Sequence, residues 1–160
     1  MSKKLANSEP EVLETDSLPV NLPVEREVLG ALIEDSGLVP EVIRGLTLDD
    51  FSIADHRRVF LAIRELVKAG SPVDVLSVSE QLGNRQHDVE IIGGLISGVV
   101  LVKSHILHHV GILRRKARLR SLAKLGRWLS DSACNPGADP DDLIRRTTEQ
   151  FSGVRETDFA

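Results

Sequence analysis

The sequence predicts an all-α protein, in which a compact head of several helices is followed by a helical hairpin. Apolar residues recur at the three-and-four spacing of amphipathic helices, and no stretch shows the sustained alternation of a half-buried strand. Proline and glycine fall mainly between these apolar runs. The chain has 160 residues with only four Phe, one Trp and no Tyr, so we expect one largely aliphatic core.

The chain begins with a segment that is poor in bulky apolar residues. Residues 1–18 mix Ser, Asn, Glu and Pro, a composition that predicts a disordered arm. The head is expected over residues 19–102. Its first helix begins near Pro23, since proline suits the first helical turn, with Asn21 or Leu22 just outside it. A short helix, Glu41 to Arg44, follows.

The central stretch of the head runs from Phe51 to Asp74. A helix here is expected to end at Gly70, which can adopt the left-handed conformation, and Asp74 suits the N-cap of the next helix, Val75 to Leu82. This helix is the expected spine of the core. We expect the core to contain Leu29, Leu32, Phe51, Val59, Phe60, Ile63 and Leu66.

The last part of the head is harder to interpret. Asp88 can cap a further turn, and the pair Gly93-Gly94 is expected to interrupt the chain. Residues 95–102 are apolar without a clear period, so they fit a strand or a short buried helix.

The longest helical pattern, Ser104 to Ser132, opens a hairpin over residues 103–152. One face of this helix carries Ile106, Val110, Leu113, Ala117 and Trp128, and the roughly opposite face carries Ile112, Leu119, Ala123 and Gly126. Two apolar faces need two partners. A helix from Pro140 to Phe151 is expected to cover one face. The face with Ile112, Leu119 and Ala123 is left for self-association with a second copy, and residues 153–160 are a plain tail.

Charge is unevenly distributed around a net value of −4. Residues 91–130 hold eight basic side chains and no acidic one, and these include Arg114, Arg115, Lys116, Arg118, Arg120, Lys124 and Arg127. They are candidate contacts to nucleic acid or to an acidic partner. They point in several directions around one helix without aromatic residues to stack bases, so structure and partner recognition are favoured over direct DNA binding.

Catalytic, cofactor and metal sites are not predicted. No Gly-Lys dipeptide is present, which excludes the ATPase phosphate-binding loop from this sequence. His105, His108 and His109 could share one helix face as zinc ligands, but packing is the better interpretation because no Cys or carboxylate lies nearby. No run of about 18 apolar residues and no signal segment occurs, and Cys134 is the only cysteine, so we expect a cytoplasmic protein without membrane contact.

A series of motifs carries a resemblance to a known family. The pattern His-Arg-x-x-Phe-x-Ala-Ile-x-x-Leu begins at His56, and Gly-x-Pro-Val-Asp begins at Gly70. Other landmarks are Pro19-Val20-Asn21-Leu22, Val28-Leu29-Gly30-Ala31-Leu32, Asp50-Phe51, Gly93-Gly94 and Lys116-Ala117. In this order and spacing they resemble the N-terminal domain of DnaB-type replicative helicases.

The resemblance implies a non-catalytic domain that acts in DNA replication through self-association, with the hairpin as the dimerisation element, and through contacts with a helicase or primase. It also favours a helix over residues 95–102, and it implies packing roles for His108 and His109. Two alternatives stay open. The chain could be a truncated piece of a full ATP-dependent replicative helicase, or a small DNA-binding regulator that uses the basic helix over residues 103–127.

Overall fold

The computed structural model describes residues 18–156, with side chains as far as Val154. Within this range the chain is all-α and contains no strand, which confirms the predicted fold class. The elements are α1 (Leu22–Glu34), α2 (Val39–Gly45), the 3-10 turn η1 (Leu48–Asp50), α3 (Ala54–Lys68), α4 (Val75–Leu82), α5 (Gln86–Ile96), α6 (Lys103–Ala133) and α7 (Pro140–Glu156).

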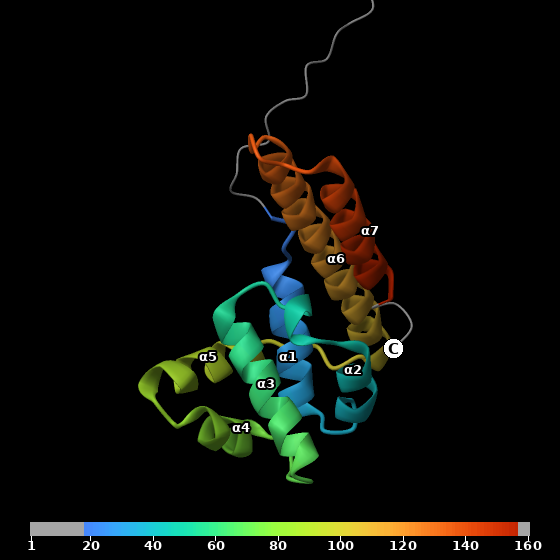
Figure 1. Ribbon diagram of the computed structural model, residues 1–160. Helices are drawn as coiled ribbons and strands as arrows, with labels where there is room; N and C mark the ends of the chain where they lie inside the picture. The colour runs from blue at the N-terminus through green and yellow to red at the C-terminus, as the bar shows by residue number, and fades with distance from the viewer. Residues whose placement is uncertain (1–17, 157–160) are drawn as a thin grey trace, which may run out of the picture.

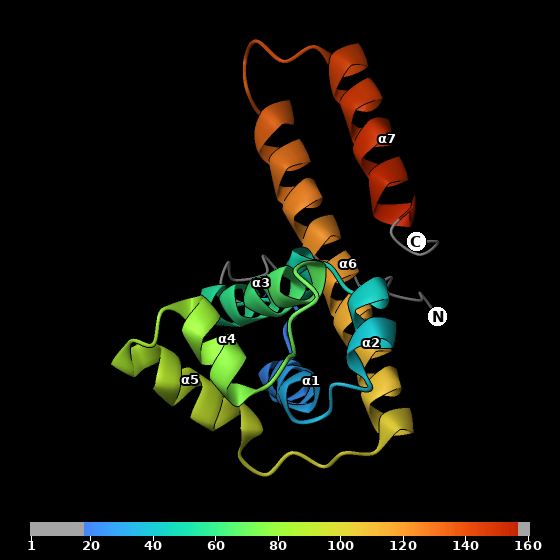
Figure 2. The same cartoon turned by 90° about the horizontal axis from the view of Figure 1, so that it is seen from below.

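The helices form a head from which a hairpin projects. Helices α1 to α5 and the first half of α6 build the head, and α6 continues out of it to pair with α7 (Figure 1). The view from below places α1 in the middle of the head, with α4 and α5 on one side of it and α2 and α6 on the other (Figure 2). Helix α6 therefore belongs to both parts of the molecule.

Local signals in the sequence explain where several helices begin and end. Asn21 caps α1 by accepting a hydrogen bond from the backbone N–H of Val24 at 3.3 Å, and Asp74 caps α4 through the N–H of Ser77 at 2.8 Å. Gly83, with φ of 110°, ends α4 in the left-handed conformation. These boundaries agree with the sequence predictions.

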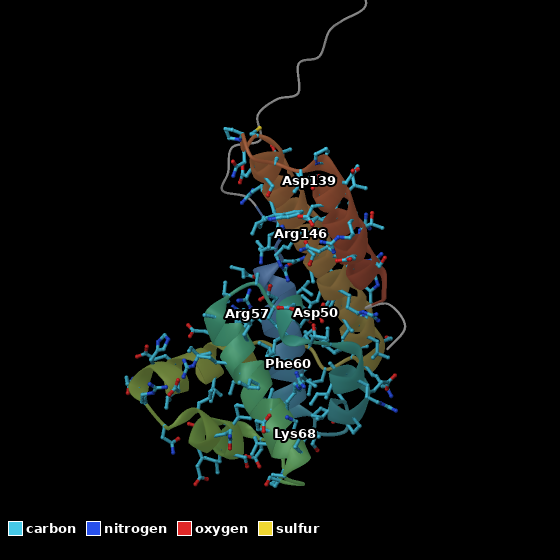
Figure 3. The ribbon with its side chains drawn as sticks, in the orientation of Figure 1. Asp50, Arg57, Phe60, Lys68, Asp139 and Arg146 are labelled. Carbon is cyan, nitrogen blue, oxygen red and sulfur yellow. The ribbon has the colours of Figure 1, made fainter. Side chains whose placement is uncertain are left out.

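Helix α3 packs its apolar face into the core of the head, beside α1. Phe60 is fully buried, and its ring lies 4.8 Å from that of Phe51, centroid to centroid. All the residues expected in the core are buried: Leu29, Leu32, Phe51, Val59, Phe60, Ile63 and Leu66. Figure 3 shows Phe60 at the centre of the head, on the α3 ribbon that crosses in front of α1.

Helix α1 packs against the end of α5 at a position that only glycine allows. A Cβ added to Gly30 would overlap the carbonyl oxygen of Leu95 and would lie 2.5 Å from a methyl group of Val99. Such distances are far below van der Waals contact, so the glycine is required for the close approach of the two segments.

The prediction for residues 86–102 was partly wrong. Helix α5 runs through Gly93 and Gly94 instead of stopping there, and it ends at Ile96, so no helix covers residues 97–102. The two glycines lie on the exposed side of α5, while Ile92 and Leu95 are buried. Burial of these two side chains outweighs the helix cost of about 1 kcal/mol for each glycine. Asp88 is the third residue of α5 and takes part in its cap, because its carboxylate accepts a hydrogen bond from the backbone N–H of the N-cap residue Arg85 at 3.3 Å.

The predicted arm and tail lie mostly outside the residues that the structure describes. Residues 1–17 of the predicted arm lie outside the described range, as do residues 157–160 of the predicted tail. Helix α7 continues to Glu156, beyond the expected end of the hairpin at residue 152. Among the residues that the structure describes, no helix has the length and apolar character needed to cross a membrane.

Candidate functional site

The hairpin is built from the second half of α6, a tight turn and α7. In the turn, the side chain of Asn135 accepts a hydrogen bond from the N–H of Gly137 at 3.3 Å, and the Asp139 carboxylate accepts one from the N–H of Asp141 at 3.0 Å. Pro140 then begins α7, which packs along α6. Arg146 of α7, labelled in Figure 3, lies over the Trp128 ring of α6 at 4.7 Å from its centroid, and this cation–π contact joins the two arms.

Helix α6 divides its apolar residues between the head and α7. Ile106, Val110, Leu113 and Ala117 are buried, and all but Ala117 belong to the core cluster of the head. The second arm was expected to cover one whole face of α6, but the head covers the first half of that face. Farther along α6, the part of the face that carries Trp128 meets α7 through Arg146.

Arg120 fixes α6 to the head and not to a partner. Its side chain is buried, and its guanidinium donates hydrogen bonds to the carbonyl oxygens of Pro19 at 3.0 Å, Asp49 at 2.7 Å and Asp50 at 2.9 Å. The prediction that Arg120 contacts nucleic acid or an acidic partner was therefore wrong. A buried guanidinium needs hydrogen-bond acceptors within the protein. The planar set of N–H donors of Arg120 suits the three carbonyl groups that converge on it.

Burial and charge have opposite effects on the ionisable groups of this junction. Burial lowers the pKa of Arg120, whereas the charges of Glu25 and Asp50 raise it. Burial also raises the pKa of Asp50, although the N–H and hydroxyl of Thr47, at 2.6 and 3.1 Å, favour its charged form. Asp50 lies where the head meets α6 (Figure 3). Its carboxylate has a structural role, because it closes the capping box of η1.

The other predicted basic residues do not form one surface. Arg114, Arg118 and Lys124 line a cleft of about 590 Å³ between the head, α6 and α7, together with Trp128 and Gln150. Arg115, Lys124 and Arg127 are exposed, and Lys116 is half-buried. The basic residues thus surround α6, as their spacing in the sequence indicated.

The residues predicted for self-association have different environments. Leu119 is 41% exposed, Ala123 is half-buried, and Ile112 is half-buried against the head core. Three further apolar side chains of the hairpin are exposed: Leu122 at 39%, Ile144 at 65% and Phe151 at 46%. The exposure of Ile144 and Phe151 was not predicted, because the helix from Pro140 to Phe151 was expected only to cover one face of the long helix. The seven-residue spacing could have shown that they share one side of α7, without telling which side faces α6.

The histidines considered as metal ligands are spread over different environments. His105 and His108 are exposed, and Nδ1 of the half-buried His109 lies 3.3 Å from Oε2 of Glu27, outside hydrogen-bond geometry. Within residues 18–154, no group of three or more His, Cys, Asp or Glu side chains is arranged to hold a metal ion.

A buried hydrogen bond between Glu25 and His56 connects α1 to α3 in the head. Glu25 is fully buried, its Oε2 lies 2.7 Å from Nδ1 of His56, and its Oε1 accepts a hydrogen bond from the N–H of Ser52 at 2.9 Å. Arg57 closes the same turn by donating to the carbonyl oxygens of Phe51 and Ser52, at 2.8 and 3.1 Å. The motif residues His56 and Arg57 are therefore structural.

This pair predicts a loss of stability in acid. Burial raises the pKa of Glu25, but the hydrogen bonds from His56 and Ser52 outweigh burial and hold the pKa below its usual value of 4.5. A carboxyl group with a lowered folded pKa stabilises the protein above its unfolded pKa, and this contribution is lost as the pH falls through the folded value.

We therefore expect the free energy of unfolding of the wild type to approach that of Glu25→Gln as the pH falls below about 4.5. Urea unfolding of both proteins from neutral to acidic pH measures this difference. A difference that stays constant over the whole range would contradict the assignment.

Comparisons with known proteins agree with this architecture. Residues 17–115 match the family model of the DnaB-like helicase N terminal domain. A probable replicative DNA helicase of Trieres chinensis is 32% identical over 68% of this chain, and the replicative DNA helicase DnaB of Mycobacterium leprae is 30% identical over 86% of it. The replicative DNA helicase DnaB of Buchnera aphidicola is 23% identical over 98%. The matched regions span 25%, 24% and 35% of these relatives, respectively.

The fold also matches a solved structure. The N-terminal domain of DnaB helicase from Mycobacterium tuberculosis superposes with a TM-score of 0.74 and 23% sequence identity, over 86% of this chain and 99% of that one. An all-α head that extends one long helix into a hairpin is thus a known architecture. The chain belongs to the DnaB-like helicase N-terminal domain family.

Proposed function

We propose that this protein acts in DNA replication as a non-catalytic domain, through self-association and through contacts with a replicative helicase or a primase in the cytoplasm. Membership of the helicase N-terminal domain family supports a role in replication, and the relatives it matches are named as replicative helicases. The family match covers an N-terminal domain, and no phosphate-binding loop occurs in the sequence. Both observations favour a function in binding over one in ATP hydrolysis.

The observation that carries the proposal is the exposed apolar surface of the hairpin. Leu119 and Leu122 lie three residues apart on α6, and Ile144 and Phe151 lie seven apart on α7, so each pair shares one side of its helix. Large apolar side chains that remain exposed favour an interaction site, because their contact with water is unfavourable. A symmetric contact between two hairpins would bury the same residues from both copies.

The proposal predicts an effect on a helicase of the same family. Added in excess to a DnaB-type helicase, the wild-type protein should change the rate of DNA unwinding, because its hairpin can pair with the hairpin of the helicase. Leu119→Asp should have a much weaker effect, since it places a charge in the apolar contact. Strand-displacement assays measure both, and the protein alone should release no phosphate from ATP.

A control separates this contact from a general effect of the substitution. Leu76 is 81% exposed on α4, away from the hairpin, so Leu76→Asp should act on the helicase as the wild type does. A helicase that does not respond to any of the three proteins would refute the proposed contact.

Direct DNA binding is the second candidate, favoured by the exposed Arg115, Lys124 and Arg127 of α6. It requires an affinity for DNA that falls steeply with salt, so that the logarithm of the affinity decreases with the logarithm of the salt concentration by about the number of phosphates neutralised.

The third candidate is that the sequence is the N-terminal part of a complete helicase, since it matches only 25% and 35% of the length of two of its relatives. The hairpin contact would then join subunits of that enzyme.

A further inference from the structure

The cleft between the head, α6 and α7 has apolar side chains in its lining. Leu125 and Trp128 of α6 and Val154 of α7 contribute to it. Trp128 and Val154 are half-buried, so part of each side chain remains in contact with water. The volume of the cleft, about 590 Å³, lies within the range of about 300–1,000 Å³ that is typical of ligand pockets. An apolar group that enters this cleft therefore loses contact with water on several sides.

The same cleft carries more basic than acidic side chains. Arg114, Arg118 and Lys124 line it from α6, and Asp49 and Asp50 line it from the head. Asp50 is engaged in the capping box of η1. Because the three cations outnumber the two carboxylates, the cleft favours an occupant that has a negative charge beside its apolar group.

Helix α7 leads the chain to this cleft. Gly153 and Val154, in its last turn, line the cleft, and the helix ends at Glu156. Figure 1 shows this end of α7 on the side of the hairpin that faces the head. Residues 157–160 follow with the sequence Thr-Asp-Phe-Ala, in which Phe159 is the only large apolar side chain. Three extended residues span about 10 Å, so Phe159 can reach the cleft from Glu156.

We propose that the aromatic ring of Phe159 binds in this cleft, against Leu125 and Trp128. Asp158 then lies beside the basic side chains of α6. An aromatic ring brings a large apolar surface and pairs favourably with a second ring. Attachment at Glu156 keeps the local concentration of the segment on the order of millimolar, so a contact that would be weak between separate molecules is sufficient.

The consequence is that α7 is held at both ends. The turn at Asn135 joins the start of α7 to α6, and the bound ring of Phe159 attaches the end of α7 to α6 and the head. The positions of Ile144 and Phe151, which are exposed on α7, then depend on this contact. Their part in self-association rests on the proposed function. In that case Phe159 strengthens the pairing of the hairpins, because it fixes these side chains in place.

The fluorescence of Trp128 tests whether Phe159 binds in the cleft. Trp128 is the only tryptophan and the chain has no tyrosine, so the emission comes from one side chain that lines the cleft. In the full chain, Phe159→Ser should shift this emission to longer wavelength and increase its quenching by acrylamide, because the ring no longer excludes water from the indole. Phe159→Leu, which keeps an apolar side chain, and Thr157→Ala, in the same segment, should stay close to the wild type. Equal emission and quenching in the wild type and Phe159→Ser would overturn the proposal.

Nuclear Overhauser contacts identify the neighbours of the ring directly. In the full chain, the ring protons of Phe159 should show contacts with a methyl group of Leu125 and with the indole of Trp128, and the absence of these contacts would contradict the proposal. In a mixture of isotope-labelled and unlabelled chains, filtered spectra detect only contacts between copies. The Phe159 contacts should be absent from these spectra, because the segment binds within its own chain. Contacts seen only between copies would overturn that assignment.

Sedimentation tests the step that rests on the proposed function. Phe159→Ser should associate several-fold more weakly than the wild type, because the end of α7 is no longer attached to the head. Equal association of the two proteins would refute the effect of Phe159 on pairing. If the wild type is monomeric while the contacts between Phe159 and Trp128 are present, the proposed self-association fails and the binding of Phe159 stands.

Discussion

Phe60→Ala should destabilise the protein by about 3–5 kcal/mol, the range typical of a buried Phe replaced by Ala. The ring of Phe60 is fully buried in the middle of α3, with Phe51 stacked at a tilt beside it. Its removal loses the transfer free energy of the ring and leaves a cavity among helices that cannot close on it. Urea unfolding at a fixed protein concentration measures the change.

Leu76→Ala is the control for that measurement. Leu76 is 81% exposed on α4, outside the surface proposed for self-association, so its truncation should cost less than about 1 kcal/mol. A similar loss for both variants, or a loss below about 1 kcal/mol for Phe60→Ala, would show that α3 does not pack in the core.

Glu25→Ala should have the second large effect, a loss of about 3 kcal/mol near neutral pH. The substitution leaves the ring of His56 and the N–H of Ser52 in a buried position without their acceptor. It also removes a negative charge that acts on the buried guanidinium of Arg120. Each of these groups was stabilised by the same carboxylate, so several interactions fail together.

The control is a carboxylate in an exposed ion pair. Glu65 accepts a hydrogen bond from Lys68 at 2.7 Å on the surface of α3, where a pair of this kind contributes well under 1 kcal/mol. Glu65→Ala should therefore change the free energy of unfolding by at most a few tenths of a kcal/mol. If Glu25→Ala has an equally small effect, the pair with His56 does not hold α1 to α3.

Local signals explain why most of the fold could be predicted. Asp74 caps the start of α4 and Gly83 ends it, and each acts on residues next to it in the chain. The boundaries of this helix can therefore be predicted from the sequence. The buried positions of α3 follow from one periodic pattern, because a single neighbour, the core, covers that face. Such features do not depend on how distant segments meet.

Features that depend on distant contacts were not predicted. Gly93 and Gly94 remain helical because Ile92 and Leu95 are buried by residues far away in sequence. Arg120 looked like its basic neighbours on α6, and only the three carbonyl groups that converge on it, from Pro19 and η1, distinguish it. The periodic pattern revealed two apolar faces on α6. It could not show that the head and α7 share the cover of one of these faces.

The exposed apolar side chains of the hairpin are proposed to drive self-association, and sedimentation equilibrium of the full chain measures it. Leu119→Asp is the disrupting variant and Leu76→Asp is the control. Wild type and Leu76→Asp should form dimers or larger assemblies with the same affinity, and Leu119→Asp should be monomeric at the same concentrations. A monomeric wild type, or association that Leu119→Asp leaves unchanged, would refute self-association through the hairpin.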